Sequence, residues 1–125
     1  MSNLIAVAIG GAIGASLRYG VTLLMISLFG KSFPYATLTV NVLGSFVMGL
    51  LFSLIDHGIV ADLPWRSLFG IGLLGAFTTF STFSMDTLLL MQQGEWQKAV
   101  LNVILNLICC IGAAWCGMQL ININN

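Results

Sequence analysis

Residues 77–84 of the chain read FTTFSTFS, which places five hydroxyl groups and three phenyl rings inside a long apolar segment. The rings recur at three-residue steps and fall near one side of a helix. In a continuous helix, the serine and threonine side chains would bond to carbonyl groups one turn earlier. Alternatively the helix is broken here, because Gly70, Gly72 and Gly75 precede the segment and hydroxyls can compensate for freed backbone groups. A break would expose a helix N-terminus suited to anions and carbonyl oxygens suited to a cation.

The composition of the chain around this segment is strongly apolar. Its 125 residues are 58% hydrophobic and only 6% charged, whereas soluble domains carry roughly 25% charged residues. The mean hydropathy of +1.02 points the same way. These values argue against a water-soluble fold, and we expect a lipid bilayer to cover most of the surface. The net charge of zero gives no sign of a nucleic-acid partner, which would require a basic patch.

Polar and turn-forming residues divide the chain into four apolar segments, at about residues 4–29, 35–55, 67–91 and 99–121. Each is long enough to cross the hydrocarbon core as a helix, which takes about 20 residues. The first segment is too long for a signal-peptide core, so we expect it to remain in the mature protein. The sequence therefore predicts an all-α membrane protein, with a single transmembrane domain over residues 1–125 and four helices, of which the third is either continuous or broken.

The distribution of basic residues leaves the orientation of the chain open. Four spans place the middle loop with Arg66 on one side and the loops with Lys31 and Lys98 on the other, and this difference hardly biases insertion. The chain has no internal repeat, so two oppositely inserted copies could supply the symmetry that transporters often have. We therefore expect an antiparallel, dual-topology homodimer. Small residues four apart could pack that dimer or the single chain, and both uses stay open: Gly10/Gly14, Ser45/Gly49 and Ala113/Gly117.

Two charged side chains lie inside the predicted spans, where their cost makes them functional candidates. Arg18 either snorkels to the interface as an anchor or supplies an anion-attracting charge at a water-filled vestibule. Asp86, near the end of the third span, is either an interfacial acid or one that lines a mouth. The cysteines of the fourth span are expected to be small apolar packing residues: Cys109, Cys110 and Cys116.

Uncharged polar side chains form stripes on two of the spans. Asn41 lies four residues from both Thr37 and Ser45 in the second span. Asn102 and Asn106 repeat that spacing in the fourth span. Such stripes either bond to a neighbouring helix or line a wet path between two helices.

The chain resembles the Fluc/CrcB fluoride channel family over nearly its whole length. The resemblance rests on three motifs in order, GGAIGASLRY at residues 10–19, TVNVLGSF at 39–46 and GLLGAFTTFSTFS at 72–84. It implies a fluoride-selective channel of the bacterial inner membrane, with two antiparallel pores in a dual-topology dimer. It also implies a break in the third helix and a structural sodium ion at the dimer centre, bound by the backbone carbonyls of Gly75 and Thr78. A passive exit suffices, because the membrane potential expels the fluoride ion that forms inside when neutral hydrogen fluoride enters.

The resemblance further assigns residues to the fluoride path. Phe80 and Phe83 map to the pore phenylalanines and Asn41 to the pore asparagine. Ser81 and Thr82 match hydroxyl positions in the same motif, whereas the vestibule role of Arg18 rests only on its charge within a span. Asn102 and Asn106 are assigned to the polar track of the fourth helix, with Asn106 as the pore residue. Since fluoride is strongly hydrated, amide and hydroxyl donors would replace its water while ring edges contact the anion.

Three other classes of protein compete with this interpretation. A small multidrug exporter also has four spans, but such carriers need an intramembrane acid and the first two spans contain no Asp or Glu. A non-transporting membrane assembly subunit would use the same glycines and polar stripes for partner contacts. An enzyme is disfavoured because the only histidine, His57, lies in a loop and no nucleophile has a visible base partner.

Overall fold

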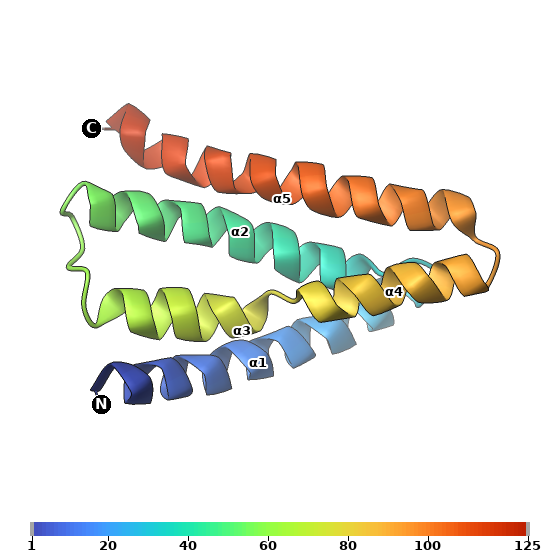
Figure 1. Cartoon of the computed structure of the whole chain (residues 1–125), viewed down its shortest axis with the longest axis horizontal. Coiled ribbons are helices and arrows are strands. Elements are labelled where there is room, and N and C mark those ends of the chain that lie inside the picture. The colour runs from blue at the N-terminus through green and yellow to red at the C-terminus, as the bar shows by residue number, and fades with distance from the viewer. Residues whose placement is uncertain (1, 125) are drawn as a thin grey trace.

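Helices make up almost all of the computed structural model, which describes residues 2–124 (Figure 1). Four of its helical stretches are long and apolar enough to cross a membrane, so the four predicted spans are confirmed and the chain is a multi-pass membrane protein. They begin and end close to the predicted limits, the largest difference being at the fourth span. The elements are α1 (Ser2–Phe29), α2 (Tyr35–Asp56), the π-helical η1 (Arg66–Leu74), α3 (Gly75–Phe77), α4 (Phe80–Gln92) and α5 (Trp96–Asn124).

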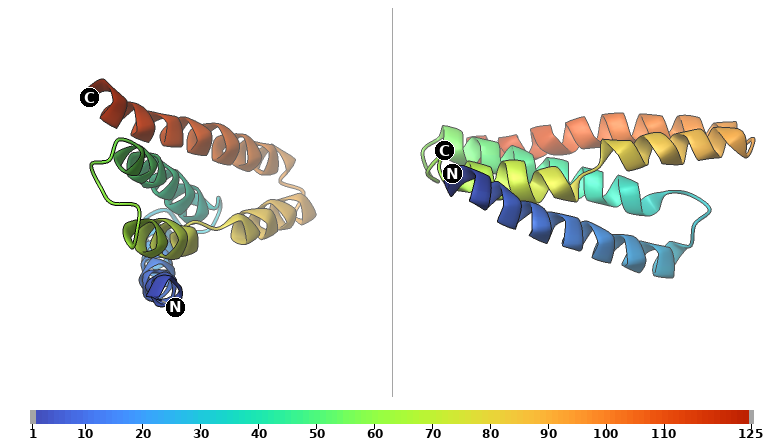
Figure 2. Two further views of the ribbon diagram at one scale, coloured as in Figure 1. Left: turned by 60° about the vertical axis from the view of Figure 1, so that its left-hand side comes forward. Right: turned by 60° about the horizontal axis from the view of Figure 1, so that its bottom comes forward.

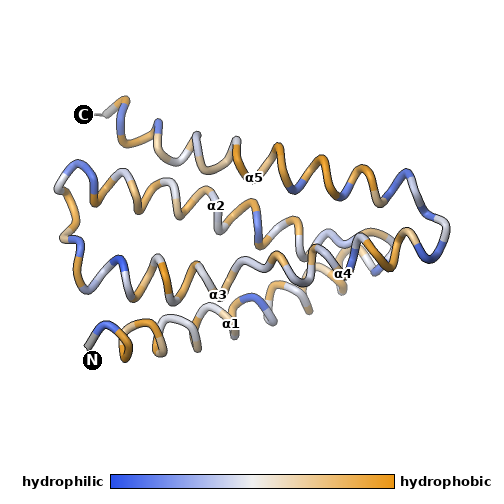
Figure 3. The backbone as a smooth tube through the Cα atoms, in the orientation of Figure 1, coloured by the Kyte–Doolittle hydropathy of each residue, from blue (hydrophilic) through white to orange (hydrophobic). Residues whose placement is uncertain are grey.

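The spans run alternately up and down, so both ends of the described chain and the loop between α2 and η1 lie at the same end of the molecule (Figure 1). Hydrophilic residues gather at the two ends, and apolar residues dominate the spans between them (Figure 3). Large apolar side chains are exposed along every span, among them Ile9, Val47, Ile71 and Ile108. An apolar outer surface of this kind suits contact with lipid tails.

The chain packs as two closely fitted helix pairs. The first half of the third span, η1 with α3, lies along α1, and α2 lies along α5. Helix α4 turns away from α1 and packs chiefly on α5 (Figure 2). The third span thus begins in one pair and ends beside the other.

Glycines permit the close approach within each pair. A Cβ atom on Gly10 or Gly14 would collide with the carbonyl oxygen of Leu68 or Leu73 on the facing η1. The same holds between α2 and α5, where a Cβ atom on Gly117 would collide with the Phe46 carbonyl oxygen. Backbones this close are typical of helix packing in membranes. These glycines therefore pack helices within one chain. The sequence had left open whether they serve this purpose or the contact between two copies.

An extended dipeptide separates α3 from α4. Thr78 has φ/ψ angles of −84°/157° and Thr79 of −151°/116°, both outside the helical region. Thr79 is the central residue of the span Arg66–Gln92. Its hydroxyl oxygen then caps α4 by accepting a hydrogen bond from the backbone N–H of Thr82 at 3.2 Å. The FTTFSTFS segment thus contributes the end of α3, the extended pair and the first turn of α4.

Candidate functional site

Asn41 of α2 holds the extended dipeptide in place. Its Oδ1 accepts a hydrogen bond from the Thr79 backbone N–H at 2.8 Å, and its Nδ2 donates to the Thr79 carbonyl oxygen at 3.2 Å. The same Nδ2 donates to Oδ1 of Asn106 on α5 at 3.0 Å. Both amide hydrogens of Asn41 therefore have acceptors within the chain. The side chain predicted to donate to fluoride serves in this structure to satisfy and fix the backbone of Thr79.

The phenyl rings of Phe80 and Phe83 lie beside this anchored dipeptide. Their centroids are 5.3 Å apart with the planes inclined by 51°. The Phe83 side chain is buried, whereas Phe80 is 74% exposed. Together with α2 and α5 they border a groove of about 240 Å³, lined by Asn41, Ser45, Thr78, Thr79, Phe80, Phe83, Asn106, Leu107, Cys110 and Ile111. Four of the predicted pore residues, Asn41, Phe80, Phe83 and Asn106, thus meet at one groove.

The two predicted hydroxyl residues do not line that groove. Thr82 points to the other side of α4, where its Oγ1 accepts a hydrogen bond from the Thr79 hydroxyl at 3.1 Å. Ser81 is exposed, and its Oγ lies 3.3 Å from the same Thr79 hydroxyl. The hydroxyls of residues 79, 81 and 82 therefore form one cluster at the start of α4. This cluster lies between the groove and a cavity on the other side of the helix.

Arg18 reaches from α1 to the carboxyl end of α3. Its Nε donates a hydrogen bond to the Ala76 carbonyl oxygen at 3.0 Å. The side chain borders a cavity of about 280 Å³, together with Ala15, Tyr19, Thr22, Thr37, Val40, Thr79 and Thr82. The guanidinium group is thus directed toward the interior beside a cavity, as the vestibule interpretation requires, and not toward the end of the span.

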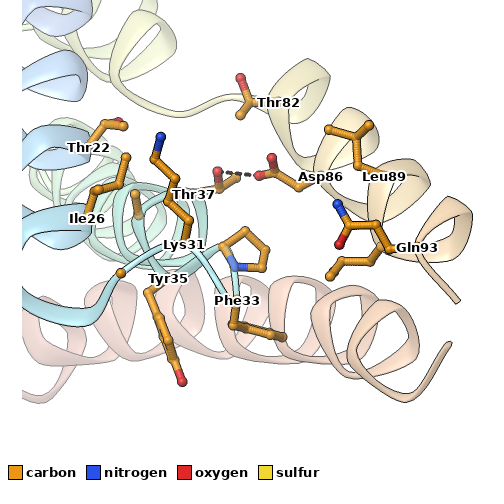
Figure 4. Close-up of a pocket in the computed structure, with 14 residues that line it drawn as sticks. Thr22, Ile26, Lys31, Phe33, Tyr35, Thr37, Thr82, Asp86, Leu89 and Gln93 are labelled. Atoms are coloured by element: carbon orange, nitrogen blue, oxygen red, sulfur yellow. Dashed lines mark hydrogen bonds between the residues drawn. The ribbon is translucent and has the colours of Figure 1, made fainter. Parts of the chain in front are cut away.

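A second cavity of about 280 Å³ opens where α1, α2 and α4 approach the loop 30–34 (Figure 4). Lys31 and Asp86 both line it, and the Thr37 hydroxyl donates to Asp86 Oδ2 at 2.7 Å. This cavity shares Thr22, Thr37 and Thr82 with the cavity beside Arg18. The two cavities are therefore neighbours, and the polar groups that line them extend from the end of the span to its middle. Asp86, whose role the sequence left open, lines the second cavity and accepts a hydrogen bond from the Thr37 hydroxyl.

The carbonyl groups of Gly75 and Thr78 lose their usual helical partners at the dipeptide. In a continuous helix, the Gly75 carbonyl oxygen would accept a hydrogen bond from the N–H of Thr79. The Thr78 carbonyl oxygen would accept one from the N–H of Thr82. Here those donors bond to Asn41 Oδ1 and to Thr79 Oγ1. Within residues 2–124, no group of three or more His, Cys, Asp or Glu side chains could bind a metal ion. Carbonyl oxygens are thus the ligands that this region offers to a cation.

Sequence reasoning missed the place of Cys110, which was taken as a packing residue but lines the groove beside the rings. Ser45, part of the polar stripe on the second span, also lines the groove. The spacing could have shown the place of Cys110, since Cys110 follows Asn106 by four residues, as Asn106 follows Asn102. The partnership of Thr37 with Asp86 had no such signal, because the two residues lie on different helices.

Comparisons with known proteins agree on one family. A family model described as "CrcB-like protein, Camphor Resistance (CrcB)" matches residues 5–118. A protein of Vibrio parahaemolyticus named "Fluoride-specific ion channel FluC" is 57% identical over 115 residues, covering 92% of this chain and 91% of the relative. Proteins with the same name from Pseudoalteromonas translucida and Shewanella oneidensis are each 54% identical, covering 92% and 97% of this chain and 96% and 97% of theirs.

Proposed function

The chain belongs to the CrcB-like family, and from that premise we propose that it is a fluoride-specific ion channel that lets fluoride leave the bacterial cytoplasm passively. The name shared by its relatives supports the choice of ion. The observation that carries the proposal is the groove at mid-span, where Asn41 fixes an extended dipeptide beside the rings of Phe80 and Phe83. This places anion-compatible groups at the depth where a barrier to ions is highest.

Fluoride passes such a groove only if protein groups replace its hydration water. Helix α4 begins at Phe80, so the positive end of its dipole lies beside the groove. The edges of the two rings carry partial positive charge and can contact a small anion. Because the Asn41 amide is occupied within the chain, its role is to hold this arrangement. The Arg18 cavity would attract the anion to the span from one end, whereas the neighbouring cavity holds the opposite charges of Lys31 and Asp86.

A second, oppositely inserted copy completes the proposed channel. The dipeptide lies at the centre of its span, Gly75 is exposed, and Phe80 is 74% exposed in the single chain. Non-helical backbone at this depth is tolerated only where protein or water covers it, because lipid tails offer no hydrogen bonds. A partner against this face satisfies that condition. An antiparallel pair would carry two grooves and therefore two pores.

Tags accessible from both sides of the membrane test this topology. A protease-cleavable tag on the C-terminus should be cut in about half of the copies in sealed inverted vesicles, and in the remainder only after the vesicles are opened, since dual insertion presents both ends on both faces. Cleavage of all copies, or of none, before opening would contradict the antiparallel arrangement. It would leave fluoride conduction itself untouched.

A sodium ion at the centre of the dimer belongs to the same proposal. The freed carbonyl oxygens of Gly75 and Thr78 are hard ligands, and unwound backbone in transporters coordinates sodium in this way. One pair of carbonyls from each copy would surround the ion on the two-fold axis. When bound, the ion would neutralise the carbonyl dipoles that meet there. Replacing external and trapped sodium with N-methylglucamine should then lower fluoride flux, and unchanged flux after prolonged exchange would remove sodium from the proposal.

Flux from liposomes that contain only this protein tests the proposed function. Vesicles loaded with potassium fluoride and given a potassium ionophore should release fluoride to an electrode, while a matched chloride load should stay inside. A folded protein that releases neither ion would support an assembly subunit instead. Proton-coupled uptake of an organic cation would support a small multidrug exporter.

A further inference from the structure

Four side chains from three helices form one continuous line of hydrogen bonds that runs from the Phe83 backbone carbonyl to Asn41. The Thr87 hydroxyl of α4 donates to the Phe83 carbonyl oxygen at 2.8 Å, and Asn102 Nδ2 of α5 donates to Thr87 Oγ1 at 2.9 Å. Asn106 Nδ2 donates to the carbonyl oxygen and to Oδ1 of Asn102, at 2.9 Å and 3.0 Å. Asn41 then donates to Asn106 Oδ1 at 3.0 Å. Every amide in the line therefore donates toward the Phe83 carbonyl.

The direction of the line is fixed at two points, the Thr87 hydroxyl and the backbone carbonyl oxygen of Asn102. A hydroxyl has one hydrogen, and Thr87 gives it to a backbone carbonyl of its own helix. Only lone pairs remain for Asn102, which must present its NH₂ group to Thr87 and its Oδ1 to Asn106. Asn106 uses its NH₂ group on Asn102, because it faces two acceptors there, the side-chain Oδ1 and the backbone carbonyl oxygen. It can offer only an oxygen to Asn41.

The orientation of Asn41 follows from this constraint. Facing an acceptor on Asn106, Asn41 must turn its NH₂ group that way and its Oδ1 toward the Thr79 N–H. A reversed Asn106 would present NH₂, and Asn41 would have to give up the Thr79 N–H to satisfy it. Water does not relieve the constraint, because Thr87, Asn102 and Asn106 are all buried and Asn102 is 0% exposed.

We propose that Thr87 and Asn102 are positioning residues that set the orientation of Asn41, through Asn106, and thereby fix the Thr79 backbone at the groove. The inference rests on the proposed fluoride channel, but it does not place Thr87 or Asn102 in contact with the ion. It gives Asn106 a role other than the sequence-based assignment to the fluoride path, since both its amide hydrogens are directed at Asn102. The line joins α4 to α5 and α5 to α2, so it couples the second half of the third span to the helix that holds the dipeptide.

A matched pair of substitutions at Thr87 tests the proposal. Thr87→Val keeps the shape of the side chain but removes the hydroxyl, and it should slow fluoride efflux about tenfold, as for one lost buried hydrogen bond. Thr87→Ser keeps the hydroxyl and should restore efflux to within about twofold of the original rate. Ser84→Ala is the control, because Ser84 also donates to a carbonyl one turn earlier but belongs to no line. It should leave efflux unchanged.

The side-chain amide signals of Asn41 supply a readout that general destabilisation would not produce. In ¹⁵N spectra of protein labelled at asparagine, these signals should shift in Thr87→Val and stay in place in Thr87→Ser and Ser84→Ala. Equal efflux from Thr87→Val and from the unaltered protein would overturn the proposal, and so would unmoved Asn41 signals. If Thr87→Val does not fold, Thr87→Cys replaces it, since a thiol is a weak acceptor and should give an intermediate shift and rate. Absence of fluoride flux in the unaltered protein would instead refute the proposed function, while the spectra still test the line.

Discussion

The two halves of the third span are held by different kinds of contact. The first half, η1 and α3, lies against α1 through glycines that bring backbone to within touching distance of backbone. The second half, α4, is held by side-chain hydrogen bonds to α2 and α5 that involve Asn41, Asn102 and Thr37. Glycine packing tolerates no added atom, whereas a hydrogen-bonded interface tolerates changes of shape but not of donor or acceptor. The first half should therefore be disrupted by added atoms, and the second half by the loss of a donor or an acceptor.

Substitution of a packed glycine should have the largest effect. Gly14→Ala places a Cβ atom against the Leu73 carbonyl oxygen, and since neither backbone can move alone, we expect a loss of about 3 kcal/mol in folding free energy. The yield of monodisperse protein after detergent extraction and its melting temperature both measure this loss. Gly20→Ala on the same helix is the matched control, because no atom lies within 4 Å of its added Cβ. Equal stability of the two variants would show that the α1 and η1 backbones are not in contact.

Removal of the Asn41 side chain should break the second half without unfolding the first. Asn41→Ala leaves the N–H and carbonyl of Thr79 without their partners, which costs about 2 kcal/mol and should reduce fluoride efflux about thirtyfold. Fluoride-electrode efflux from liposomes measures the change. Ser16→Ala removes a hydroxyl that bonds only to its own helix and should conduct normally. Normal efflux from Asn41→Ala would remove the anchored dipeptide from the mechanism.

Substitution of the two rings separates a packing role from a permeation role. Both Phe80→Ile and Phe83→Ile should slow fluoride efflux about fivefold, on the order of the 1 kcal/mol that an aromatic contact supplies. Only Phe83→Ile should also lower the melting temperature, because Phe83 is buried and Phe80 is exposed. Phe29→Ile, at the end of α1, is the control for loss of a ring. Undiminished efflux from both variants would exclude the rings from the path.

The four spans could be predicted because the length of an apolar run is compared directly with the thickness of a bilayer, without knowledge of the fold. Their packing could not, since Gly10 and Gly14 show that a close contact forms but not which helix supplies the other side. The π-helical geometry of η1 also had no sequence signal, as such helices are rare and are set by packing. The partner of Arg18 was missed for a similar reason, because a carbonyl freed at Ala76 exists only once α3 has ended.

The sequence predicted which residues line the candidate site better than it predicted what each side chain does there. Asn41, Phe80, Phe83 and Asn106 do share a groove, and the family resemblance had assigned all four to the pore. Which way an amide faces depends on partners from other helices, so the sequence could not show that Asn41 bonds to Thr79 or that Asn106 bonds to Asn102. The hydroxyls of Ser81 and Thr82 were assigned to the same place because they match hydroxyl positions in the family motif. On a helix, neighbours in sequence point to different sides.

The smallest effect is expected at the end of η1, outside both kinds of interface. Arg66 and Asp62 form an ion pair of 2.8 Å one turn apart, with about half of each side chain exposed, at 44% and 56%. Water and salt screen such a pair, so Asp62→Asn should change the folding free energy by less than about 0.5 kcal/mol and leave fluoride efflux unaltered. Melting curves at low and high salt measure the change, which should vanish at high salt. A larger, salt-independent loss would mean that a partner copy covers Arg66 in the membrane, and that the first half of the span depends on polar contacts as well as on glycine packing.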